Sequence, residues 1–103
     1  MTKYKAVPTY IDGIRFASKK EAGRYCELKL LEKAGAISDL ELQTKFPIIL
    51  NNGKICTYKA DFSYVQLLGS KRIVEDVKGF RTPVYKLKKK LVEALYKIKI
   101  IEI

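Results

Sequence analysis

The pattern of apolar and polar positions predicts a short hairpin and then a long helix in the first third of the chain. Residues 9–16 place apolar side chains on both sides of Asp12-Gly13, a dipeptide that favours a two-residue hairpin turn. Ser18 suits a helix N-cap, and Glu21 three positions later completes a capping box. We expect this helix to run to about Ala34, because a glycine follows that suits the left-handed position after a helix.

Three extended segments follow and predict a β-meander. Residues 40–50, 55–66 and 72–78 are rich in β-branched and aromatic side chains, and short turn-forming stretches separate them. Pro47 in the first segment suits an edge strand, because proline cannot donate a backbone hydrogen bond.

A second helix and a last strand complete the pattern. Thr82 suits an N-cap and Pro83 the first helical position, and we expect this helix to reach about Lys97. Its predicted apolar stripe consists of Leu87, Leu91, Ala94 and Leu95. Residues 98–103 form the final strand, which should lie parallel to the third strand of the meander in a right-handed βαβ unit. The chain is therefore predicted to be one α/β domain over residues 1–103, with the order α-β-β-β-α-β and a mixed sheet after a short N-terminal hairpin.

The apolar residues of the first helix surround more than half of its circumference. A helix of this kind usually contacts two partners, and one small sheet cannot cover residues such as Leu28 and Leu31 together. We therefore predict a homodimer, which is also the default symmetric assembly. The alternative is that the N-terminal hairpin folds back over the helix.

Charge adds a prediction about partners. The chain has 21 Lys and Arg against 11 Asp and Glu, a formal net charge of +10. This excess favours a polyanion, with nucleic acid before an anionic membrane, although charge also serves solubility. No apolar stretch approaches the roughly 20 residues that span a bilayer, and the N-terminus lacks the apolar region of a signal peptide. We expect a cytoplasmic protein without a membrane partner.

The absence of histidine narrows the possible chemistry. The absence of His, with Cys26 and Cys56 thirty positions apart, argues against a zinc site. It also removes Ser-His and Cys-His nucleophiles. We expect both thiols to be reduced and buried. Any catalysis must use carboxylates, lysine, tyrosine or a metal ion.

Alternation along the predicted meander brings acidic residues together. Asp76 and Lys78 share one face of the third strand, and Glu75 lies on the other face, where we expect a structural or interface role. Asp61 on the second strand should converge with Asp76 and Lys78 if the registers match. Two adjacent carboxylates repel unless a cation lies between them, and oxygen ligands favour Mg²⁺ or Mn²⁺. The alternative is a solvent-facing ion pair on an edge strand.

These residues resemble a motif of a known nuclease family. Asp61 followed by Asp76-Val77-Lys78 resembles the PD-(D/E)xK motif of restriction-endonuclease-like nucleases, although Ala60 replaces the usual proline. Glu21 matches the helix carboxylate of Holliday-junction resolvases and of TnsA-type endonucleases. The order of elements resembles the core of that superfamily. Four stretches also resemble a small phage and prophage family: residues 12–16, 18–22, 58–62 and 74–80.

The resemblance implies a Mg²⁺-dependent deoxyribonuclease that needs no small-molecule cofactor. Asp61 and Asp76 would hold one or two Mg²⁺ (or Mn²⁺) ions, with help from the Val77 carbonyl and from Glu21. Lys78 would orient or deprotonate the attacking water. Glu21 has the alternative of being only the reciprocal cap of its helix.

DNA would be the partner, held by basic and polar side chains that are alternatively ordinary solvated residues. The candidates are Lys19, Lys20, Gln43, Lys45, Lys59, Arg81, Lys86, Lys89 and Lys90. So short a chain favours recognition of shape, such as branched or junction DNA in recombination, in the host cytoplasm if a phage encodes it. Two other readings compete: a non-catalytic nucleic-acid-binding module with a decayed nuclease core, and a small phage protein that binds another protein.

Overall fold

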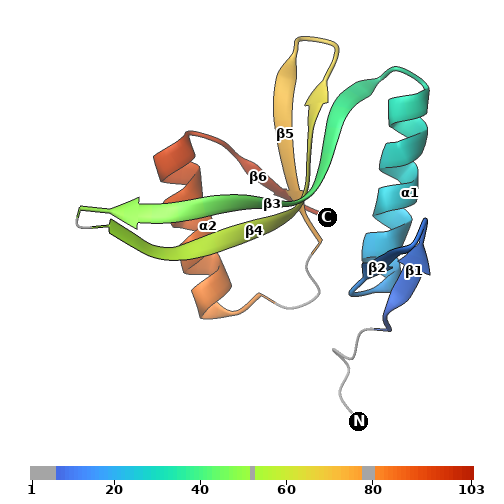
Figure 1. Ribbon diagram of the computed structural model, residues 1–103. Helices are drawn as coiled ribbons and strands as arrows, with labels where there is room; N and C mark the ends of the chain where they lie inside the picture. Colours follow the sequence, from blue (N-terminus) through green and yellow to red (C-terminus); the bar gives the residue numbers. More distant parts are fainter. Residues whose placement is uncertain (1–6, 52, 78–80) are drawn as a thin grey trace.

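The computed structural model describes residues 7–51, 53–77 and 81–103. In these ranges it has two helices and six strands, which confirms the predicted α/β class and the order of elements (Figure 1). The elements are β1 (Thr9–Ile11), β2 (Ile14–Phe16), α1 (Lys19–Lys33), β3 (Ile37–Leu50), β4 (Gly53–Gln66), β5 (Lys71–Asp76), α2 (Pro83–Tyr96) and β6 (Ile100–Glu102).

The main sheet is mixed, as predicted. Its strand order is β3-β4-β5-β6, with antiparallel pairing of β3 to β4 and of β4 to β5, and parallel pairing of β5 to β6. Strands β1 and β2 form a separate antiparallel hairpin. Its turn residues Asp12 and Gly13 have φ of 54° and 76°, the positive values that the predicted two-residue turn requires.

Local caps fix both helices. The Ser18 hydroxyl accepts a hydrogen bond from the Glu21 amide at 3.1 Å, and Gly35 has φ of 82° after the end of α1. Thr82 caps α2 in the same way by accepting from the Tyr85 amide at 3.0 Å. Neither α1 nor α2 is long and apolar enough to span a membrane.

Two cores lie on opposite faces of the sheet, because alternate residues of β5 enter different cores. Ile73 packs against the core beneath α1, and Val74 belongs to the core beneath α2. The first core contains Phe16, Ala22, Tyr25, Leu28, Ile37, Phe62 and Tyr64. The second contains Phe46, Ile48, Tyr58, Ala60, Val74, Val92 and Ile100.

The β3–β4 hairpin changes helix partner halfway along its length. Ala60 belongs to the core beneath α2, whereas Phe62, on the same nominal side of β4, belongs to the core beneath α1. Between them lies Asp61, opposite Gln43, whose positive φ of 54° bends β3 at this point. In Figure 1 the far end of the β3–β4 hairpin runs past α2. Asp61 thus occupies the bend between the two halves of the molecule.

The predicted apolar stripe of α2 was right for Leu91, which packs against the second core, and wrong for its other three members, which are exposed. Val92 is fully buried, whereas Leu87 and Leu95 are 59% and 44% exposed. Tyr85 and Tyr96 face the sheet instead, and their hydroxyls donate hydrogen bonds of 2.8 Å to acceptors on β6 and β3. Tyrosine combines an apolar ring with a polar tip, so it covers a sheet whose partner atoms are polar.

Two further expectations about burial need correction. Cys26 is exposed, contrary to the expectation that both thiols are buried, and Cys56 is half-buried against the second core; both are free. Leu28 of α1 is fully buried, so only part of the proposed dimer surface stays open, at Leu30 and Leu31, which are 68% and 39% exposed. The N-terminal hairpin covers the opposite part of α1, because Phe16 packs against Tyr25 with ring centroids 4.9 Å apart.

Candidate functional site

Asp61 lies where three strands meet. Its Oδ1 accepts a hydrogen bond from Gln43 Nε2 on β3 at 3.3 Å, and its Oδ2 accepts one from the Val77 amide, just after β5, at 2.8 Å. The side chain is partly exposed. Because its carboxylate links β3 to the end of β5, this residue is fixed from two sides and still reaches solvent.

Asp76 ends β5 on the other side of the same junction. The residue is fully buried, and in the parallel register it is the partner of Glu102 on β6. The Tyr58 hydroxyl donates a short hydrogen bond to Asp76 Oδ2. Burial, and then this hydrogen bond, raise the pKa of Tyr58 well above its ordinary value, so Tyr58 remains a donor at neutral pH.

The registers bring Asp61 and Asp76 to neighbouring positions. Phe62 pairs with Glu75 in the antiparallel register, so the next pair of facing positions is Asp61 and Asp76. Neighbouring strands of a sheet lie about 4.8 Å apart. Glu21 is buried in the first turn of α1. Within the described ranges, no three Asp, Glu or Cys side chains gather into a group that could hold a metal ion, so the expected set of three carboxylates is not assembled. Lys78 lies outside the described residues.

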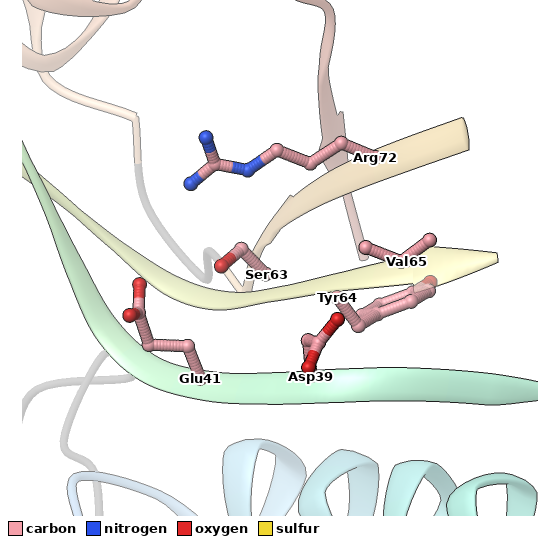
Figure 2. A pocket seen from close by; sticks show the side chains of 6 residues that line it. All are labelled: Asp39, Glu41, Ser63, Tyr64, Val65 and Arg72. Atoms are coloured by element: carbon pink, nitrogen blue, oxygen red, sulfur yellow. The ribbon is translucent and has the colours of Figure 1, made fainter. Parts of the chain in front are cut away.

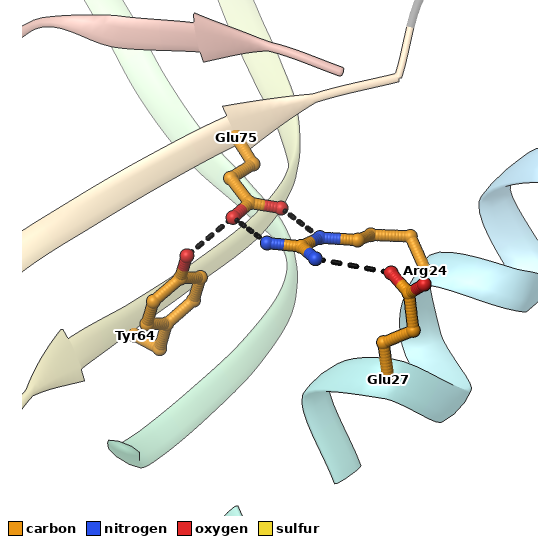
Figure 3. A network of polar contacts seen from close by, with 4 residues as sticks. All are labelled: Arg24, Glu27, Tyr64 and Glu75. Carbon is orange, nitrogen blue, oxygen red and sulfur yellow. Dashed lines mark hydrogen bonds and ion pairs between the residues drawn. The ribbon is translucent and has the colours of Figure 1, made fainter. Parts of the chain in front are cut away.

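Glu75 occupies the face where a structural role was expected. It is 1% exposed, and Arg24 of α1 binds it through two hydrogen bonds, Nε to Oε1 at 2.8 Å and Nη2 to Oε2 at 2.6 Å (Figure 3). The Tyr64 hydroxyl also donates to Oε2, and burial together with this bond raises the pKa of Tyr64 to about 12. The bond with Glu75 is the main cause that raises the Arg24 pKa above its usual range. This cluster joins α1 to β5.

A second polar cluster surrounds Glu102 at the end of β6. The Tyr85 hydroxyl donates to Glu102 Oε2 at 2.8 Å, and Arg81 Nε donates to Oε1 at 2.8 Å. Lys89 Nζ lies 3.9 Å from Oε2. The Tyr85 hydrogen bond is the largest cause that lowers the Glu102 pKa. Arg81 and Lys89, both proposed to contact DNA, therefore already share a carboxylate.

Other candidate DNA contacts lie open on the surface. Lys45 and Lys59 are exposed and stand directly opposite each other across β3 and β4. The remaining exposed lysines of the proposed set are Lys19, Lys20, Lys86 and Lys90. They come from both helices, whereas Lys45 and Lys59 come from the sheet.

A separate hollow opens on the β3, β4 and β5 strands away from these residues. It is lined by Asp39, Glu41, Ser63, Tyr64, Val65 and Arg72 (Figure 2). Asp39 has a positive φ of 56° in an irregular part of β3. None of the predicted metal ligands lines this hollow, so the hollow is not part of the predicted metal site.

The donors at the end of β5 match a hard divalent cation in their chemistry. Carboxylate oxygens such as those of Asp61 and Asp76 are the ligands that Mg²⁺ and Mn²⁺ prefer. The hydrogen bond from Tyr58 to Asp76 is of the kind that orients a ligating carboxylate from outside. The donor set therefore fits such an ion, with Asp61 as its solvent-accessible member.

Several residues of these clusters were not predicted as site residues, among them Arg24, Tyr58 and Glu102. Tyr58 lies two positions before Ala60 on the same face of β4, and this alternation is a usable signal, because a buried tyrosine hydroxyl needs a partner. The partner itself comes from another strand, and Arg24 and Glu75 are 51 positions apart. Such pairs are fixed by tertiary packing and not by local spacing.

Comparison with known proteins identifies a family. The sequence model described as "Protein of unknown function (DUF1064)" matches residues 1–101, nearly the whole chain. No curated protein and no solved structure matches the chain. The matched region includes the N-terminal hairpin, both helices and the proposed site.

Proposed function

We propose that this chain, which belongs to the DUF1064 family, is a metal-dependent DNA endonuclease of the PD-(D/E)xK type. The observation that carries the proposal is the hydrogen bond from the Val77 amide to Asp61, which ties the first motif residue to the segment holding Asp76 and Lys78. The proposal includes a restriction-endonuclease-like core. It also includes selectivity for branched or junction DNA and a role in phage DNA metabolism.

Each motif residue has a separate task in this proposal. Asp61, Asp76 and the Val77 carbonyl would hold Mg²⁺ or Mn²⁺, with Glu21 as a further oxygen donor. The bound ion would supply charge stabilisation at the scissile phosphate and an acidified water. The Lys78 amine would orient or deprotonate that water and offset phosphate charge. Gln43 would keep the Asp61 carboxylate turned toward the end of β5 by donating to its Oδ1.

We also propose that the protein acts as a homodimer. Cutting both strands of a duplex requires two active sites, and a twofold pair presents them to one DNA. Leu30 and Leu31 on α1 offer an exposed apolar surface for this contact. Sedimentation equilibrium without DNA, at tens of micromolar protein, tests the dimer, and a single species of 11.8 kDa would exclude it.

A non-catalytic DNA-binding module is the second candidate. The burial of Asp76 and its hydrogen bond with Tyr58 favour it, because an active metal site must expose ligand oxygens to the ion. In this case the protein binds DNA in a salt-dependent way and cuts none of it.

Cleavage of a panel of branched and linear DNAs with Mg²⁺ separates these candidates. We expect strand cleavage that Asp61→Asn abolishes and that Lys78→Ala slows by roughly 10²–10⁴-fold without loss of DNA affinity. Asp39→Asn is the matched control, since it removes the same charge from an exposed position of β3 where asparagine tolerates the positive φ. Cleavage by Asp61→Asn at the wild-type rate would exclude the proposed site.

Thermal unfolding gives a readout that does not depend on activity. An ion that binds only the folded state raises the melting temperature, with about 2.7 kcal/mol of stabilisation at one hundred times its dissociation constant. We expect Mg²⁺ or Mn²⁺ to produce this rise in the wild type and in Asp39→Asn. The absence of the rise in Asp61→Asn would identify Asp61 as a ligand, and an equal rise would remove it from the site.

A further inference from the structure

The outer half of the β3–β4 hairpin presents one uncovered face. From Thr44 to Ile49, buried positions alternate with exposed or partly exposed ones, and α2 covers the buried side through Phe46 and Ile48. The uncovered side consists of three cross-strand pairs: Lys45 with Lys59, Pro47 with Thr57, and Ile49 with Lys54. This half of the hairpin is thus a two-stranded ribbon with one free side, which we call the outer ribbon.

The charge of the outer ribbon has one sign. Residues 44–60 contain three lysines and no Asp or Glu. Lys45 and Lys59 stand opposite each other, and like charges in directly opposed positions destabilise a sheet. An anion lying against both ammonium groups removes this repulsion. The third lysine, Lys54, lies near the tip, so the positive charge extends along the whole ribbon.

We propose that the outer ribbon lies in the major groove of a B-form DNA duplex beside the cleavage site. This inference rests on the proposed nuclease function and deepens it by naming the substrate as duplex DNA. A major groove about 12 Å wide admits a two-stranded β-ribbon, with lysines reaching phosphates on both groove walls. The deep and narrow major groove of A-form RNA does not admit such a ribbon.

The position of Asp61 sets the distance between groove contact and cleavage. Lys54 pairs with Ile49, which follows Gln43, the residue opposite Asp61, by six positions on β3, and this corresponds to about 20 Å of extended strand at ~3.3 Å per residue. At ~3.4 Å per base pair, the tip contacts the duplex roughly six base pairs from the scissile phosphate. A substrate arm shorter than this loses the tip contact.

Binding measured without divalent metal tests the inference apart from cleavage. Fluorescence anisotropy, in EDTA, compares a DNA duplex with an RNA duplex of the same sequence. We expect at least about tenfold tighter binding of DNA. Lys54→Glu should weaken DNA binding by roughly tenfold and reduce the slope of log affinity against log salt by about one. Lys71→Glu is the matched control, because it makes the same change at an exposed strand position at the far end of the sheet.

Each outcome decides one point. Equal affinity for the RNA duplex, or equal DNA affinity of Lys54→Glu and Lys71→Glu, would overturn the groove assignment. A changed sedimentation mass in Lys54→Glu, with unchanged DNA affinity, would assign the ribbon to contact between copies of the chain. If Lys54→Glu fails to fold by circular dichroism, Lys59→Gln replaces it in the same comparison. If the binding results are as expected but the protein cleaves no DNA, only the nuclease function is refuted. If the protein cleaves DNA but Lys54→Glu binds DNA as tightly as the control, only the groove assignment is refuted.

Discussion

Removing Arg24 should destabilise the protein strongly, because it leaves a buried carboxylate without its cation. The Glu75 side chain is 2% exposed and that of Arg24 is 22% exposed, and two hydrogen bonds of 2.8 and 2.6 Å join them. Removing one partner of a buried ion pair costs about 3–5 kcal/mol. Since Arg24 keeps some contact with solvent and Tyr64 still donates to Glu75, we expect Arg24→Met to lose about 3 kcal/mol.

Urea unfolding at neutral pH measures this loss. A domain of this size typically has 5–15 kcal/mol of stability, so about 3 kcal/mol is a large part of the total. The corresponding fall in melting temperature is on the order of 12–24 °C, at about 4–8 °C per kcal/mol. Methionine keeps an unbranched side chain and a high helix propensity, so the change is confined to the charge and its hydrogen bonds.

Two variants serve as controls for this result. Arg24→Met combined with Glu75→Gln should recover at least half of the loss, because the neutral amide still accepts from Tyr64 and no charge is buried. Glu27→Gln removes the negative charge of the exposed second partner of Arg24, 3.0 Å away, and should change stability by less than about 0.5 kcal/mol. A loss below about 1 kcal/mol in Arg24→Met, or no recovery in the double variant, would refute the reasoning.

Three further predictions follow from other contacts. Lys59→Gln removes one of two facing lysines and should raise the free energy of unfolding by roughly 0.2–1 kcal/mol while it weakens DNA binding, as urea unfolding and anisotropy would record. The folded-state pKa of Glu102 is lowered from 4.5, so its carboxylate stabilises the fold above that value and this contribution disappears as pH falls through the lowered pKa; the stability deficit of Glu102→Gln at pH 7 should therefore vanish in strong acid. The Tyr64 pKa is raised to about 12, so ultraviolet titration of Tyr64→Phe should lose an ionisation near that pH, while an unchanged curve would contradict the buried hydrogen bond.

Local signals predicted most of the fold. The capping serine at Ser18 and the Asp12-Gly13 turn each act over a few residues, and the structure has both where they were expected. The predicted alternation holds along residues 40–49 of β3, whereas consecutive residues are buried on β4 and β5. The parallel pairing of β5 with β6 followed from the helix between them. These features were predictable because their causes lie within one turn or one connection.

The bend at Gln43 could not be predicted from local sequence signals. A non-glycine residue with φ of 54° carries no reliable sequence signal, yet it lies where the hairpin changes from one core to the other. The same limit explains the error on α2, where Tyr85 and Tyr96 face the sheet and Leu87 faces solvent. Apolar periodicity places leucine inside, and it does not foresee polar acceptors on the opposing strands that favour tyrosine.

The two buried acidic residues of β5 lie on the two faces of one strand, and only one of them, Asp76, belongs to the proposed metal site. Glu75 faces α1, and both of its carboxylate oxygens accept hydrogen bonds from Arg24. Because the guanidinium neutralises this carboxylate, we do not expect Glu75 to bind an added cation. Asp76, the next residue, faces the other side, toward Tyr58 and the strand that carries Asp61. The Arg24–Glu75 pair fixes the end of β5 against α1, one turn of helix from Glu21. A pair that cannot itself bind an ion thus sets the position of the carboxylates proposed to do so, and for that reason variants of Arg24 should weaken Mg²⁺ binding even where the protein remains folded.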